Sequence, residues 1–252
     1  MSTQLDEATT KYVGEAQSAL TSDHIPTEII EMLGHAKGAI ESITSARNQM
    51  TSDLAELDAR RVMLPPAGFR QLEQKAIGEA QATHAASAKI ARTAIAAIKE
   101  QLEAEALPKV DPARESLDRD TALAYLGNAD GPKLGSRLLK IAESGPPEVV
   151  ATLLNSTFGE GILKSRQVHA ETIANARRIA RVSPYRQRSP REQAAYEQIR
   201  PDDRETNATG PSTAFGKLEG ALIAAETSFL QATNTRSRGI VQATHAGTIG
   251  PG

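Results

Sequence analysis

The chain has 252 residues, which is long enough for one large domain or two small ones, and its formal net charge is only −2. It contains no Cys, which excludes disulfide frameworks, thiolate metal sites and Cys nucleophiles. Aromatic residues make up 3% of the chain, against 39% hydrophobic residues overall. We therefore expect long helices packed closely through small and aliphatic side chains.

The first elements predicted are an N-terminal helix, assigned to 1–24, and a long helical hairpin, assigned to 25–107. Between Ile29 and Leu57 apolar residues recur at steps of three and four, which is typical of one buried helix face. The sequence 64–68, Leu-Pro-Pro-Ala-Gly, then interrupts the pattern, and an alanine-rich stripe resumes after it. The two arms have similar lengths, so we expect them to pair antiparallel. Gly34 and Gly38, one turn apart, predict a close crossing of another helix, with a hinge as the alternative.

The sequence pattern changes after residue 107, and this change predicts a small helical subdomain at 108–182. Short apolar segments there are separated by breakers such as Gly145-Pro146-Pro147. The expected helices cover 116–126, 133–143, 148–155 and 159–182. The segment 183–212 is polar and rich in Pro and Gly, so we expect a linker or an arm, with a short helix at 191–199. A last helix and a tail are assigned to 213–252, and this helix should complete a bundle with the hairpin and the N-terminal helix.

No motif in the sequence predicts a catalytic, metal or cofactor site. The Glu31/His35 and Glu79/His84 pairs lack the Glu-x-x-His spacing of di-iron bundles. The run from Gly159 to Ser165 has glycines before Lys-Ser but no Gly directly before the Lys, so a helix start is the better interpretation. We therefore expect no enzyme, no cofactor and no small-molecule substrate.

Charge is distributed unevenly, and this gives the only candidate contact residues. Residues 1–107 carry 15 acidic and 10 basic side chains, a net charge of −5, whereas 166–191 holds seven Arg and one Glu. Arginine binds phosphates and carboxylates in bidentate fashion. The favoured interpretation is pairing with the acidic hairpin of the same or a neighbouring subunit, and the alternative is contact with a nucleic-acid backbone. The candidates are Arg177, Arg178, Arg181, Arg186, Arg188 and Arg191.

The predicted fold is all-α, with a long antiparallel, coiled-coil-like hairpin, flanking helices and a small helical subdomain. The function expected first is that of a non-enzymatic structural protein in a multi-subunit assembly, more specifically a virion component such as a phage connector, internal or scaffold-type protein. Its partners would be copies of itself or other subunits. A nucleic-acid-binding protein using the Arg-rich segment is one alternative, and a secreted bacterial coiled-coil interaction protein is another. No run is apolar enough to span a bilayer, and the polar N-terminus predicts no signal peptide, hence synthesis in the cytoplasm.

Overall fold

The computed structural model describes residues 2–21, 24–183, 185, 188–199 and 211–246, with side chains from residue 4 to residue 235 of these ranges. The fold is all-α, as predicted, and no strand occurs in those ranges. The chain divides into two compact units. Unit 1 comprises Met1–Leu20, Ile30–Ile98 and Arg204–Gly252, and unit 2 comprises Thr21–Ile29 and Lys99–Asp203. This division cuts across the ranges expected from the sequence, because both long arms of the hairpin contribute one end to unit 2.

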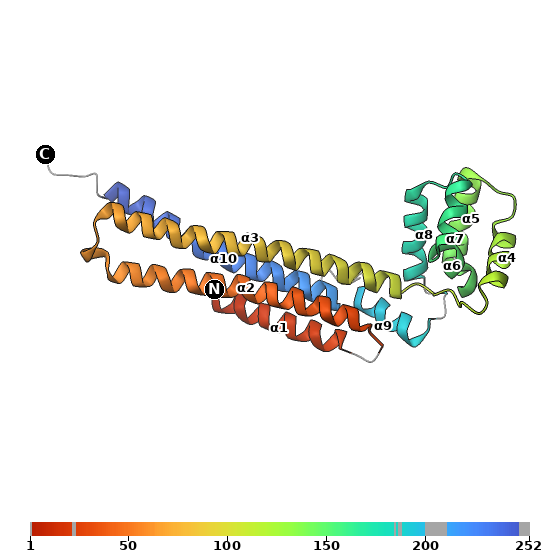
Figure 1. Ribbon diagram of the computed structural model, residues 1–252, viewed down its shortest axis with the longest axis horizontal. Helices are drawn as coiled ribbons and strands as arrows, with labels where there is room; N and C mark the ends of the chain where they lie inside the picture. The colour runs from red at the N-terminus through yellow and green to blue at the C-terminus, as the bar shows by residue number, and fades with distance from the viewer. Residues whose placement is uncertain (1, 22–23, 184, 186–187, 200–210, 247–252) are drawn as a thin grey trace. The chain divides into compact units, whose positions relative to one another are not determined.

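Unit 1 is a bundle of long helices that run side by side (Figure 1). The predicted hairpin is formed by α2 and α3, joined by a 3-10 turn, η1. The alternating apolar positions of α2, from Leu33 to Leu54, are buried as the spacing predicts. Helix α1 packs along α10. The bounds of these elements are α1 (Ser2–Leu20), α2 (Thr27–Ala59), η1 (Arg61–Met63), α3 (Pro66–Glu105) and α10 (Ala214–Ala246).

The glycine that lies against a neighbouring helix in unit 1 is not one of those that the sequence predicted. A Cβ atom built at Gly34 or Gly38 would meet no heavy atom of a neighbouring element within 4 Å, so the predicted close crossing there is wrong. A Cβ at Gly220 would instead lie 3.3 Å from the ring of Tyr12. The small residue that α1 needs is therefore on α10, because α1 packs against that helix.

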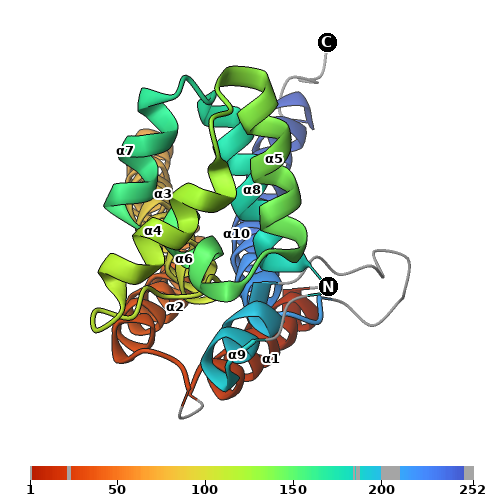
Figure 2. The same ribbon diagram turned by 90° about the vertical axis from the view of Figure 1, so that its right-hand side faces the viewer.

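Unit 2 contains the predicted small subdomain, whose short helices are drawn in Figure 2. These helices enclose an apolar core of their own. Its core runs from Leu107 to Ala180 in the sequence. The α4 helix is capped at its C-terminus by Gly127, where φ is +57°, a conformation that favours glycine. The helices are α4 (Glu115–Leu126), α5 (Gly131–Ser144), α6 (Pro147–Leu154), α7 (Thr157–Ser165), α8 (Ala170–Val182) and α9 (Pro190–Ile199).

The single helix predicted at 159–182 is wrong, because two helices occupy this range. The chain leaves the helical path at Gln167, whose φ is +59°. The amides of Gln167 and Val168 then donate to the carbonyls of Lys164 and Leu163, which closes α7 with a C-terminal capping pattern. The start of α7 agrees with the sequence: the Gly159 amide donates to Ser156 Oγ at 3.0 Å, an N-cap, so this glycine run begins a helix.

Candidate functional site

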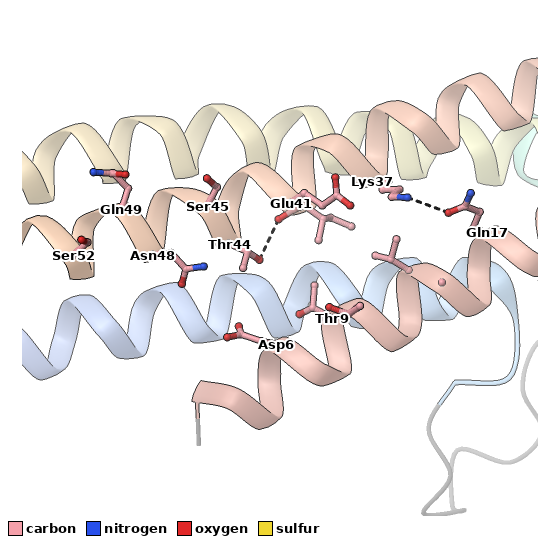
Figure 3. A pocket seen from close by; sticks show the side chains of 14 residues that line it. Asp6, Thr9, Gln17, Lys37, Glu41, Thr44, Ser45, Asn48, Gln49 and Ser52 are labelled. Atoms are coloured by element: carbon pink, nitrogen blue, oxygen red, sulfur yellow. Dashed lines mark hydrogen bonds between the residues drawn. The ribbon is translucent and has the colours of Figure 1, made fainter.

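The bundle of unit 1 carries a groove of about 680 Å³ between α1 and α2 (Figure 3). Its lining residues recur at steps of three and four on both helices, so each wall is one face of a helix. Between Lys37 and Ser52 the α2 wall is about 23 Å long, which matches roughly four turns of a helix. The lining residues are Asp6, Thr9, Thr10, Val13, Gly14, Gln17, Lys37, Ile40, Glu41, Thr44, Ser45, Asn48, Gln49 and Ser52.

The groove combines an apolar base with polar walls. Val13 and Ile40 are buried, whereas most other lining side chains carry hydroxyl, amide or charged groups. Lys37 Nζ donates to Gln17 Oε1 at 3.2 Å and so links the two walls (Figure 3). The groove therefore offers apolar contact and hydrogen-bond partners along one line, which suits the side of another helix.

A buried arginine joins three helices beside this groove. Arg47, on α2, is 6% exposed, and its guanidinium donates to both carboxylate oxygens of Asp6 on α1, at 2.6 and 2.8 Å. It also donates to Ser228 Oγ on α10 and to the side-chain oxygen of Asn48. The guanidinium can make all of these hydrogen bonds only when α1, α2 and α10 are aligned along their lengths as they are here. Arg47 thus fixes the position of α1, and with it one wall of the groove.

The outer face of α10 presents a ridge, defined here as Ile223, Thr227 and Leu230, in which two exposed apolar side chains flank a half-buried threonine. Ile223 and Leu230 are exposed, and the three residues follow steps of four and three along one helix face. The opposite face of α10 is buried, with Leu218, Leu222 and Phe229 in the core. The ridge therefore has the periodicity of a helix interface on the solvent side of the bundle.

Two of the predicted arginines form ion pairs within unit 2. Arg181 Nη1 lies 2.6 Å from Glu103 Oε2, and Arg191 Nε lies 2.6 Å from Glu105 Oε2. Burial alone would raise the pKa of Glu105, but the hydrogen bonds and charges of Arg191 and Lys109 outweigh it and lower that pKa below its ordinary value. The pKa of Arg191 is raised in turn, mainly by its hydrogen bond to Glu105.

Two of the other predicted arginines, Arg177 and Arg188, bind backbone carbonyls at helix ends. Arg177 Nε donates to the carbonyl of Leu154, the last residue of α6, at 2.8 Å. Arg188 donates to the Ser183 carbonyl after α8, and its guanidinium lies 4.1 Å from the ring centroid of Tyr196. Positive side chains at helix C-termini stabilise the unpaired carbonyls there. Arg178 is exposed and donates to Asn175. Arg186 lies outside the described residues.

The structure thus brings the Arg-rich segment onto unit 2 itself, and it reveals a groove and a ridge that the sequence reasoning missed. The signal for the groove was present, because Thr9, Gln17, Thr44, Asn48 and Ser52 follow the same helical spacing as the apolar residues. Over the described part of the chain no three His, Asp or Glu residues are grouped as a metal site would require. His84 stacks on Phe229 with ring centroids 4.3 Å apart, which is packing in the bundle.

No helix in the part of the chain that the structure describes is long and apolar enough to cross a membrane. No protein-family model, curated protein or solved structure matches this chain.

Proposed function

We propose that this chain is a non-enzymatic assembly subunit, in which the α10 ridge of one copy docks into the α1–α2 groove of the next. The observation that carries the proposal is the groove, whose walls have helical periodicity over about four turns of α2 and about three turns of α1. The buried Val13 and Ile40 at its base would receive Ile223 and Leu230 of the neighbouring copy. The hydroxyl and amide groups of the walls would surround that contact as a polar rim.

A contact of this kind joins two different surfaces of the same chain. Such head-to-tail interfaces build rings when the rotation closes and filaments when it does not. This is the behaviour required of a structural subunit, and the fixed register of α1 supports it, because a wall held by Arg47 and Asp6 is already in place before a partner arrives. The specific form proposed is a virion component, such as a connector, internal or scaffold-type protein.

The alternative of nucleic-acid binding has less support. Arg177, Arg181, Arg188 and Arg191 already donate hydrogen bonds to acceptors within unit 2. A phosphate backbone would have to compete with those carboxylates and carbonyls for each guanidinium. The third expectation, a secreted interaction protein, makes no prediction about the groove and stays a prediction from the sequence pattern.

Site-directed photo-crosslinking tests the proposal, because the chain has no Cys of its own. Ser45→Cys places a photoreactive maleimide label in the groove, and Thr93→Cys places the same label on exposed α3. We expect covalent dimers from position 45 whose crosslinked peptides map to α10, and none from position 93. Equal crosslinking from both positions, or none from position 45, would contradict the proposal.

A further inference from the structure

The turn that closes the hairpin holds two apolar side chains in solvent. Val62 is 98% exposed and Met63 is 85% exposed, whereas no other exposed large apolar side chain in the described ranges exceeds 75%. Both belong to η1, at the end where α2 and α3 meet (Figure 1). Leaving such side chains in water forfeits the burial that normally stabilises them, so this exposure needs a physical explanation.

The backbone of this turn is held by a hydrogen bond and by the two prolines that follow it. The Met63 amide donates to the Arg60 carbonyl at 2.9 Å, which closes the 3-10 turn. Two prolines follow, of which Pro65 has a fixed φ and Pro66 begins α3. The apolar pair is therefore presented in a defined conformation and would lose little backbone entropy on binding.

The charged side chains within the turn region are all basic. Residues 60–72 contain Arg60, Arg61 and Arg70 and no acidic residue, although acidic residues flank this segment on both sides. Arg61 lies over the ring of buried Phe69, 5.4 Å from its centroid. Arg60 pairs with Glu56 at 3.9 Å, but both side chains are largely exposed, so this pair is weak and readily exchanged.

We propose that this hairpin tip, residues 60–70, docks on an anionic lipid surface. Val62 and Met63 would enter the interfacial region, and the three arginines would contact headgroup phosphates. A projecting turn with two adjacent apolar side chains fits a flat, deformable interface, whereas a protein partner would need a pocket of matching shape. The proposal is independent of self-assembly through the groove, because it involves a projecting turn whose residues do not line the groove.

Vesicle binding by the full chain tests this inference. The chain has no Trp, so Met63→Trp gives a fluorophore at the tip alone, and Ile90→Trp at an exposed position of α3 is the matched control. With vesicles of phosphatidylcholine and phosphatidylserine, we expect a blue shift of emission at position 63 and none at position 90. Pure phosphatidylcholine vesicles should give little shift, and added salt should reverse the binding.

Two further variants separate the apolar and the charged contributions in co-sedimentation assays. Arg60→Gln with Arg61→Gln should weaken the partition coefficient about fivefold for each arginine. Val62→Ser with Met63→Ser should weaken it on the order of tenfold, and since these side chains are exposed the helical content should not change. The inference is overturned if the wild-type chain fails to bind anionic vesicles. It is equally overturned if binding ignores lipid charge, or if only an acidic protein, and no vesicle, shifts the fluorescence at position 63.

Discussion

Removing the acidic partner of Arg47 should destabilise unit 1 more than removing Arg47 itself. Asp6→Ala takes away the carboxylate that accepts two hydrogen bonds from a guanidinium that is 6% exposed. The arginine then stays buried with only part of its charge compensated. Arg47→Met instead places an apolar side chain in the core and leaves Asp6, whose side chain is 32% exposed, in contact with water.

The magnitudes follow from burial. Breaking a fully buried ion pair from one side costs about 3–5 kcal/mol. Because Asp6 is one-third exposed and Arg47 keeps Ser228 and Asn48 as acceptors, we reduce this to about 2 kcal/mol for Asp6→Ala. Replacement of a buried charge by a side chain of similar volume is often close to neutral, so Arg47→Met should cost about 1 kcal/mol or less. Combining both changes should restore most of the stability lost in Asp6→Ala.

Urea unfolding followed by circular dichroism measures these differences, and hydrogen exchange of α1 peptides locates them. A loss of about 2 kcal/mol corresponds to a midpoint lower by about 1 M urea. Glu7→Ala is the matched control, since it removes an exposed carboxylate from the same turn of α1. The reasoning is refuted if Arg47→Met is the more damaging change, or if Asp6→Ala behaves like Glu7→Ala.

Three further outcomes concern unit 2. The pKa of Glu105 in the folded chain is lower than its ordinary 4.5, so the stability that Glu105 contributes is present above pH 4.5 and is lost as pH falls through the folded pKa. In thermal melts at acid pH, Glu105→Gln should therefore show a smaller decline of the melting temperature with falling pH than the wild type. Gly159→Ala would force a Cβ against backbone oxygens of α6 and should cost more than about 3 kcal/mol, whereas Gly161→Ala meets nothing within 4 Å and should gain up to about 1 kcal/mol, both by urea unfolding. Arg177→Ala should lower the free energy of unfolding by about 1–2 kcal/mol, whereas Arg178→Ala should change it by no more than about 0.5 kcal/mol. If both variants instead keep the stability of the wild type and no longer retard DNA at low salt, these arginines form a nucleic-acid site.

The elements that sequence reasoning predicted well are those specified by local periodicity. The buried face of α2 follows directly from the three-four spacing between Leu33 and Leu54, and the break between the arms follows from two adjacent prolines. The helices around the core of unit 2 were also predictable, because Gly and Pro residues separate the short apolar segments that form them. The split between α7 and α8 was missed because Gln167 carries no turn signal: its left-handed conformation is imposed by the capping bonds of α7.

The candidate site was harder to predict because it depends on which helices pack together. The polar faces of α1 and α2 become the walls of a groove only because α1 packs on α10, with Tyr12 close to Gly220. No local pattern specifies that pairing. For the arginines, opposite charge made intramolecular pairing foreseeable, but the partner did not follow from spacing: Arg181 and Glu103 are 78 residues apart. Contact of these arginines with a subunit or a nucleic acid stays a prediction.

The central claim is assembly through the α1–α2 groove, and the mass in solution tests it most directly. Light scattering over a range of concentrations should give multiples of 26.8 kDa for the wild-type chain. Thr10→Arg, which fills the groove, should reduce the mass towards that of one chain, and Thr93→Arg on exposed α3 should not. A wild-type chain that stays at 26.8 kDa at every concentration, or a groove variant that assembles as the wild type does, would contradict the account.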